Sequence, residues 1–229
     1  FFLVLIVRSG WLVRTNRRPE GFWAPNRTRS GPAPKKIRLY LWLHLVVDSL
    51  WLLNGIIFVT LLFVSGGWAR IVPKSWEVFP NAVSVALQYV SLDWPTENGW
   101  VNYNSLQLLA YFVIVFVAAP LAIMSGARMS AFWPQKLATL NRVYTVEIAR
   151  AVHFPVMLFF VLFTIVHVTL VLSTGALRTL NHMYAAQDGD GWAGAIIFAI
   201  SAVLMIAAWF AVRPFVVRQV AMLFGTVTR

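Results

Sequence analysis

Residues 148–174 read IARAVHFPVMLFFVLFTIVHVTLVLST, a long apolar run that contains His153 and His167, two of the chain's four histidines. The run is long enough for a membrane span, because an α-helix needs roughly 20 apolar residues to cross a bilayer. A helix advances about 1.5 Å and 100° per residue, so the two histidines lie about 21 Å apart along the axis and about 40° apart around it. We therefore predict a membrane-spanning helix with both imidazoles on one face.

Ionisable side chains inside a membrane span are rare because burying them is costly, so two histidines on one face need a physical reason. One interpretation is that each neutral imidazole is an axial ligand to a haem iron, with one haem near each membrane surface. The other interpretation is that both histidines only hydrogen-bond neighbouring helices. The spacing leaves both interpretations open.

The composition is that of a multi-span membrane protein. Of the 229 residues, 59% are hydrophobic and 12% are charged, and the mean hydropathy is +0.71. A net charge of +11 would suggest nucleic acid as the partner of a soluble protein. Here the charges lie between apolar spans, so they set orientation and no nucleic-acid partner is expected. The sequence contains no cysteine, which excludes iron–sulfur clusters, thiolate metal sites, disulfides and covalently attached haem within it.

Four whole spans and one partial span are expected, which predicts an all-α transmembrane helix bundle. Residues 1–7 are too short to cross a bilayer and lack the charged leader of a signal peptide. They are interpreted as the last two turns of a helix whose beginning is missing. A single bundle is expected over residues 1–215, followed by a tail at 216–229. The whole spans are predicted at about 39–64, 104–125, 150–173 and 193–213.

A small-residue motif follows each of the first four apolar runs. The motifs are Arg8-Ser9-Gly10, Ser65-Gly66-Gly67, Ser125-Gly126 and Ser173-Thr174-Gly175. Glycine just past a helix accepts the left-handed conformation that ends it, so each motif is predicted to close a span. The alternative is that glycine also lets the edge of a haem approach the backbone.

Basic residues alternate between the predicted loops. Sixteen of the nineteen Lys and Arg residues lie in residues 8–38, 127–150 and 213–229, whereas 67–103 and 174–192 carry more acids than bases. By the positive-inside rule the first three segments are cytoplasmic, which predicts a multi-pass protein with a cytoplasmic C-terminus. The basic, Pro/Gly-rich first loop is interpreted as a topology signal in contact with anionic lipid, or as a docking surface for a cytoplasmic partner.

The predicted outer loop at 67–103 is built differently from the basic loops. Four tryptophans suited to the headgroup interface recur in it, namely Trp68, Trp76, Trp94 and Trp100. Residues 81–90 are expected to form a short helix on the outer surface, which either covers a cofactor or rests on lipid.

The predicted orientation assigns a depth to each histidine. His44 and His153 both lie near the cytoplasmic ends of their spans, so they can share one haem. His167 lies in the outer half of its span. Its partner is either His182 in the outer loop or a histidine upstream of Phe1, and the second is favoured because the outer half of the first span would lie there. The ordinary interpretation of His182 is a solvated loop histidine.

Four charged residues complete the candidate site. Asp48 lies one helical turn beyond His44 and so on roughly the same face. Asp48 either accepts the second N–H of the imidazole and fixes its tautomer, pairs with an arginine, or carries protons towards a quinone, in that order of preference. Arg8, Arg128 and Arg150 lie at the cytoplasmic ends of spans, where they either pair with haem propionates or only mark the positive side.

These features together resemble the bacterial cytochrome b561 group, which includes the b-type membrane subunits of nickel–iron hydrogenases and formate dehydrogenases. The resemblance covers about residues 1–215. It rests on four or five spans, a histidine early in one helix, two histidines fourteen residues apart on a later helix, and the Ser/Thr-Gly motifs. The local sequences at 91–100 and 180–184 are most similar to those of family members that are paired with molybdopterin-dependent oxidoreductases.

The resemblance implies two b haems that carry electrons between an extracytoplasmic oxidoreductase, of molybdopterin or hydrogenase type, and the quinone pool of a bacterial inner membrane. It implies that His44 and His153 ligate one haem, and that His167 ligates the other with a first-span histidine that this sequence lacks. The sequence has no nucleophile–base set or phosphate loop, so substrate chemistry is expected to belong to another chain. A competing hypothesis is a cofactor-free membrane anchor or scaffold, in which the histidines only pack helices.

Overall fold

The computed structural model describes residues 1–26, 34–94, 102–130, 133–134 and 136–228. The Pro/Gly-rich centre of the basic first loop and Trp100 of the predicted outer loop lie outside the described residues. The chain forms two compact units, Phe1–Val59 with Ile196–Arg229 and Thr60–Ala195.

Among the residues that the structure describes, four helices are long and apolar enough to cross a membrane, which confirms the predicted all-α membrane bundle. They are Leu39–Val64, Ser105–Met129, Val146–Ser173 and Ala193–Ala211, each within a few residues of its predicted bounds. Only 6% to 11% of the residues in their apolar windows are buried. Apolar surface on this scale must face lipid or another chain, so the protein is a multi-pass membrane protein.

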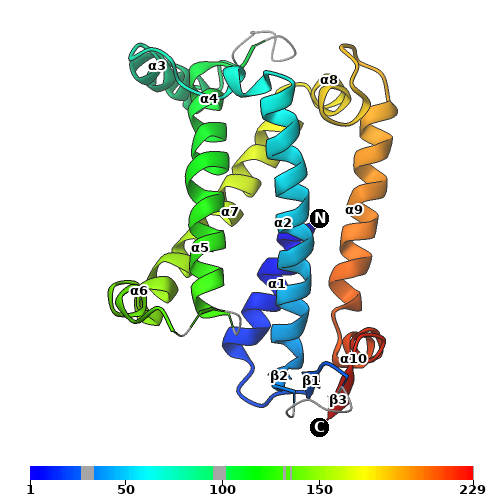
Figure 1. The fold of residues 1–229 in the computed structure, drawn as a ribbon. Helices are drawn as coiled ribbons and strands as arrows, with labels where there is room; N and C mark the ends of the chain where they lie inside the picture. Colours follow the sequence, from blue (N-terminus) through cyan, green and yellow to red (C-terminus); the bar gives the residue numbers. More distant parts are fainter. Residues whose placement is uncertain (27–33, 95–101, 131–132, 135, 229) are drawn as a thin grey trace. The chain divides into compact units, whose positions relative to one another are not determined.

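The first unit contains the N-terminal helix and the C-terminal segment (Figure 1). Its first helix does not end with the predicted stub at 1–7 but continues through Ser9 and Gly10 to Thr15. The continuation is stabilised because Leu12 and Val13, like Leu5, pack against the core of this unit. The elements are α1 (Phe2–Thr15), β1 (Phe22–Ala24), β2 (Ile37–Arg38), most of α2 (Leu39–Val64), most of α9 (Ala193–Ala211), α10 (Pro214–Met222) and β3 (Thr226–Thr228).

A small antiparallel sheet in the order β2-β1-β3 joins the first loop to the C-terminal segment. The indole N–H of Trp23 in β1 donates a hydrogen bond to the carbonyl of Ala221 in α10 (3.1 Å), and its ring lies 5.9 Å from that of Trp42. The segment after residue 215, expected to be a tail, is therefore part of a folded unit. Its core consists of Leu39, Tyr40, Trp42, Val212, Val217 and Ala221.

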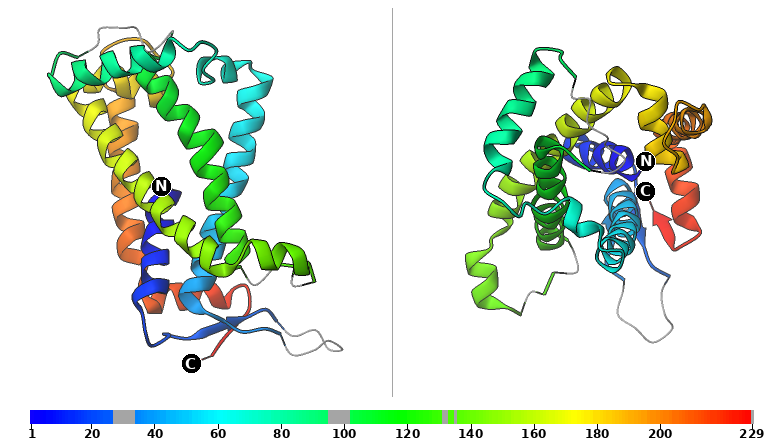
Figure 2. Two further views of the ribbon diagram at one scale, coloured as in Figure 1. Left: turned by 90° about the vertical axis from the view of Figure 1, so that its left-hand side faces the viewer. Right: turned by 90° about the horizontal axis from the view of Figure 1, so that it is seen from above.

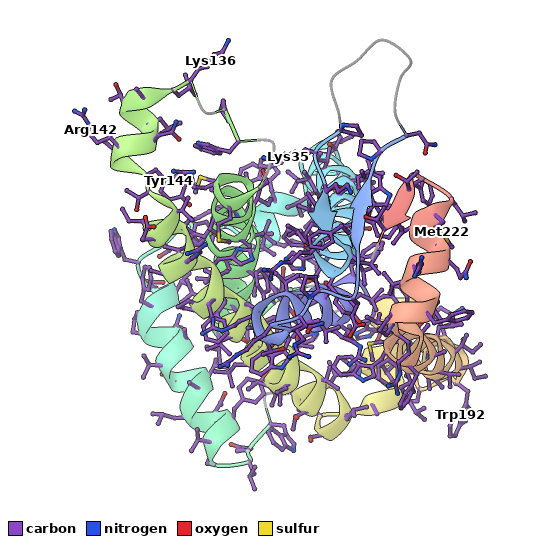
Figure 3. The ribbon with its side chains drawn as sticks, turned by 90° about the horizontal axis from the view of Figure 1, so that it is seen from below. Lys35, Lys136, Arg142, Tyr144, Trp192 and Met222 are labelled. Atoms are coloured by element: carbon purple, nitrogen blue, oxygen red, sulfur yellow. The ribbon has the colours of Figure 1, made fainter. Side chains whose placement is uncertain are left out.

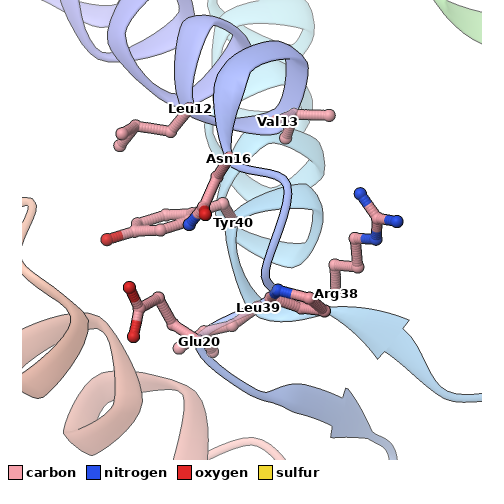
Figure 4. Close-up of a pocket in the computed structure, with 8 residues that line it drawn as sticks. Leu12, Val13, Asn16, Glu20, Arg38, Leu39 and Tyr40 are labelled. Atoms are coloured by element: carbon pink, nitrogen blue, oxygen red, sulfur yellow. The ribbon is translucent and has the colours of Figure 1, made fainter.

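Beside this core a small hollow lies between the end of α1 and the start of α2 (Figure 4). Apolar side chains line the hollow from both helices, and its polar groups come from the loop and from the ends of the two helices. The lining residues are Leu12, Val13, Asn16, Pro19, Glu20, Arg38, Leu39 and Tyr40.

The second unit holds two packed helix pairs, α5 against α7 and α3 against α4. α4, η2 and α5 form one span, in which η2 is a π-helical turn. Pro120 follows this turn and has no N–H for the carbonyl of Phe116, so the wider turn accommodates its ring. The elements are the end of α2, η1 (Gly67–Arg70), α3 (Val78–Val90), α4 (Ser105–Phe112), η2 (Val113–Ala118), α5 (Ala119–Met129), α6 (Ala138–Val143), α7 (Val146–Ser173), α8 (Ala176–Leu180), η3 (Asn181–Ala185) and the start of α9.

The short helix predicted at 81–90 is confirmed as α3, which begins three residues earlier. In Figure 2 it runs across the end of α4. α3 buries Ala82 and Val85 and exposes Val83 and Leu87. Both faces are therefore apolar, and only one of them is covered by this unit.

The four small-residue motifs are of two kinds. Gly66 and Gly175 follow the ends of α2 and α7 with left-handed φ values of 73° and 110°, which confirms them as helix ends. Gly10 and Gly126 instead lie inside α1 and α5, so the prediction that their motifs close a span is wrong. The physical reason is that these two motifs contact histidines on neighbouring helices.

Candidate functional site

His44 lies on α2 in the first unit, and its imidazole contacts α1. Nδ1 of His44 is 2.9 Å from Oγ of Ser9. A Cβ atom on Gly10 would lie 3.0 Å from Cε1 of the same ring. Ser9 is fully buried, and 14% of the His44 side chain is exposed. The Ser-Gly pair therefore forms a close-fitting seat for the imidazole.

His153 lies on α7 in the second unit and contacts α5 in the same way. Its Nδ1 is 2.9 Å from Oγ of Ser125. A Cβ atom on Gly126 would lie 3.5 Å from Cε1 of His153, and Ser125 is fully buried. Two histidines from different spans therefore have the same Ser-Gly surroundings, each within its own unit.

The hydrogen bonds of the two serines indicate which imidazole nitrogen carries the proton. Oγ of Ser9 is 2.7 Å from the carbonyl oxygen of Leu5, and Oγ of Ser125 is 2.6 Å from that of Leu121. A carbonyl can only accept and a serine hydroxyl has one proton, so each hydroxyl donates to its carbonyl and accepts from the Nδ1–H. In this tautomer the lone pair is on Nε2, as a metal-ligating histidine requires.

Asp48 lies next to His44, as its spacing predicts, but at the other ring nitrogen. Its Oδ2 is 3.4 Å from Nε2, which is longer than an ordinary N–H···O bond of roughly 2.7–3.2 Å. The role first suggested for Asp48, accepting the second N–H of the imidazole, is filled by Ser9.

His167 has aromatic surroundings instead of a Ser-Gly seat. Its ring stacks on that of Phe163, with centroids 5.5 Å apart and an interplanar angle of 9°. The ring of Tyr111, on α4, meets it nearly edge-on at 6.3 Å. The two histidines of α7 therefore differ in what holds them, although they share one helix.

The interpretation of His182 as a solvated loop histidine is wrong. It lies in η3 with 17% of its side chain exposed. Its Nε2 is 2.8 Å from Oδ1 of Asp188, and the guanidinium of Arg178 donates to both carboxylate oxygens of that residue, at 2.8 and 3.1 Å. A hydrogen-bonded network of three side chains therefore holds the ring.

Arg8 is half-buried on α1. Its Nη2 donates to the carbonyl of Val212 (3.3 Å), and its guanidinium lies 4.3 Å from the centre of the Trp209 ring. Its Nε is buried and has no hydrogen-bond partner among the described residues. A buried donor without a partner is costly, so this atom is suited to an anionic group that the polypeptide does not supply.

Arg128 and Arg150 differ from Arg8. Arg128 is 8% exposed, and its Nε donates to the carbonyl of Tyr144, which fastens α5 to the segment before α7. Arg150 is exposed. Arg142, in the last turn of α6, and Lys136, just before that helix, also point outward (Figure 3). This end of the second unit is therefore basic, and one of its arginines has a structural role.

Within the described ranges there is no group of three or more His, Asp or Glu residues that could hold a metal ion. A haem needs only axial ligands from the protein, because the porphyrin supplies four nitrogens. Three features of this chain fit such a group: lone pairs on Nε2 of two half-buried imidazoles, glycines against those rings, and the buried Nε of Arg8.

The sequence contains a signal for the two serines, although it does not single them out. Trp11, Leu12 and Val13 follow the first Ser-Gly pair, and Met129 follows the second. Apolar residues beyond a motif indicate that the helix continues through it. A serine and a glycine inside a helix are then better explained by a close contact than by a cap.

The fold and the geometry together define a class, a multi-pass membrane protein in which two half-buried imidazoles each contact a buried serine. No protein-family model matches the chain, and no curated protein or solved structure matches it either. Its function is therefore inferred from its own residues.

The network around Asp188 predicts a loss of local stability in acid. The hydrogen bonds from Arg178 and His182 lower the pKa of Asp188 from 3.8 to about 2. The folded state therefore favours the ionised carboxylate, and this stabilisation is complete above about pH 4 and lost as the pH falls towards about 2. Hydrogen-exchange protection of residues 176–194, corrected for intrinsic rates, should fall within this window. In Asp188→Asn it should be lower at neutral pH and flat across the window; a wild-type protein that is also flat would contradict the prediction.

Proposed function

We propose that this chain is the membrane subunit of a respiratory complex and transfers electrons through b-type haems between an extracytoplasmic oxidoreductase and the quinone pool. The observation that supports the proposal most strongly is the repeated seat of His44 and His153. In each seat a buried serine holds Nδ1, and the lone pair is on Nε2. Histidines that only pack helices require neither one particular tautomer nor a glycine against the ring.

The proposal gives each candidate residue a role. His44 and His153 ligate one haem through Nε2, as their predicted depth suggests, and His167 ligates a second haem. His182 is less suited as the second axial ligand of that haem, because Oδ1 of Asp188 lies within hydrogen-bond distance of its Nε2, at 2.8 Å, whereas Oδ2 of Asp48 is 3.4 Å from Nε2 of His44. Arg8 pairs with a propionate through its buried Nε. A bound haem supplies a one-electron iron couple inside the membrane.

The direction of the chain in the membrane follows from its charges. The basic loops and the basic C-terminal segment are cytoplasmic by the positive-inside rule, in a bacterial inner membrane. The partner on the opposite side is an oxidoreductase of molybdopterin or hydrogenase type, which carries out the substrate chemistry. This assignment rests on the charge pattern and on the resemblance described above.

A pyridine haemochrome assay on the purified protein tests the proposal. We expect haem b in stoichiometric amount and a reduced-minus-oxidised spectrum typical of six-coordinate haem. A protein that is folded by circular dichroism but free of haem after expression with ample haem supply would contradict the proposal. That result would favour the cofactor-free membrane anchor.

A further inference from the structure

We propose that Ser9 and Ser125 are positioning residues that hold His44 and His153 in the Nδ1–H tautomer and thereby lower the reduction potential of the ligated iron. The tautomer follows from the polypeptide alone. The effect on the potential rests on the proposed function.

The two serines are equivalent in every distance that fixes a proton. Each Oγ is 2.9 Å from Nδ1 of its histidine. Each is also within 2.7 Å of the carbonyl four residues earlier, and within 3.2 Å of the carbonyl three residues earlier. Because these carbonyls only accept, the serine proton is committed to the backbone and the oxygen is left as an acceptor. Both serines are fully buried, so water does not compete for that oxygen.

Other hydroxyl groups show that this arrangement is specific. Ser49 on α2 donates to the carbonyl of Leu45 at 2.8 Å, and Thr164 on α7 donates to that of Phe160 at 2.8 Å. Both therefore make the same backbone bond, but neither forms a hydrogen bond to an imidazole among the described residues. Bonding to the preceding turn is common for serine and threonine in helices, whereas its combination with a half-buried imidazole occurs at His44 and His153.

The adjacent glycines allow the serines to reach the rings. A Cβ atom at Gly10 would lie 3.0 Å from His44, which is tighter than ordinary van der Waals contact. A larger residue here would push the ring away from Ser9. At Gly126 the corresponding distance is 3.5 Å, so that site tolerates one additional methyl group.

An acceptor at Nδ1 makes the imidazole a stronger electron donor at Nε2. A stronger donor stabilises ferric iron more than ferrous iron, because the ferric ion carries the larger positive charge. The serines are therefore expected to lower the reduction potential. Their removal should raise it without removing a ligand.

The first experiment tests the tautomer without haem. Histidine is labelled with ¹⁵N in the haem-free protein, and the four histidines are assigned by single substitution. We expect His44 and His153 to carry the proton on Nδ1. We expect Ser9→Ala to release His44, and Ser125→Ala to release His153, into a mixture of tautomers. Ser49→Ala is the matched control and should leave both unchanged. Wild-type protein with the proton on Nε2 of both rings would overturn the proposal.

The second experiment measures the potential of the haem-loaded protein by spectroelectrochemistry. Ser9→Ala and Ser125→Ala should each keep the haem content and raise one midpoint potential, by up to about tenfold in the equilibrium constant, or about 59 mV for one electron. Ser9→Thr and Ser125→Thr keep the hydroxyl and should restore the wild-type value. Potentials in both alanine variants equal to those of Ser49→Ala would overturn the proposed effect. A protein that binds no haem would instead contradict the proposed function, and the ¹⁵N result would still decide the tautomer.

Discussion

His153→Ala should lower the haem b content from about two per chain to about one, and His44→Ala should remove the same haem. Alanine deletes the Nε2 lone pair and leaves the buried Ser125 or Ser9 oxygen without its imidazole donor. We expect identical difference spectra for the two variants and for the double variant, because both ligands belong to one iron under the proposed function. The measurement is a haemochrome assay with a potentiometric titration of the remaining haem.

Two further substitutions make this test specific. His167→Ala should remove the other haem and leave the spectrum of the one bound by His44 and His153. His182→Ala should retain both, because the imidazole of His182 is held by Asp188. Wild-type haem content in both His44→Ala and His153→Ala would show that these imidazoles do not ligate iron. Loss of haem in His182→Ala would identify His182 as the missing partner of His167.

The spans could be predicted from the sequence because the physical constraint is simple. A helix in a bilayer needs a certain length and an apolar surface on all sides, and both are visible in a single window of residues. The predicted spans differ from the observed helices at the helix ends. Helix α7 begins at Val146, four residues before the predicted start, because Thr145 accepts a hydrogen bond from the N–H of Ile148 and caps it.

The Ser-Gly motifs show why local patterns were ambiguous. Gly66 and Gly10 both follow an apolar run, yet one ends a helix and the other lies against an imidazole 34 residues away in sequence. The dipeptide is the same, and the difference is set by the neighbouring helix. Local pattern can place a histidine on a span, but only the packed structure identifies the residue that holds its Nδ1.

The sheet and the surroundings of His182 were missed for a related reason. Strands β1 and β3 have three residues each and pair across about 200 positions of sequence, too short and too distant for a periodic signal. The environment of His182 depends on Asp188, six residues later, across a turn that contains a left-handed residue, Ala186. Neither contact can be derived from the spacing of apolar residues.

Gly194→Ala should destabilise the corner between α8 and α9 by about 3 kcal/mol or more. The substitution would ordinarily favour a helix, since alanine is better than glycine by about 1 kcal/mol. At Gly194 we expect the opposite effect, a loss of stability. A Cβ atom on Gly194 would overlap the carbonyl group of Leu180 and the backbone nitrogen of Asn181, and backbone atoms cannot move aside as a flexible side chain can.

Asn181 explains why this clash cannot be relieved at low cost. The residue is 1% exposed, and its side chain accepts from the N–H of Gly194 at 2.7 Å and donates to the carbonyl of Gly189 at 2.7 Å. If α9 shifted to make room, both bonds would break and leave a buried amide unsatisfied. Gly189→Ala is the matched control, because a Cβ atom there meets nothing within 4 Å. Thermal unfolding in detergent and limited proteolysis between residues 174 and 192 should therefore separate the two variants, and equal stability would show that the corner is looser than its contacts indicate.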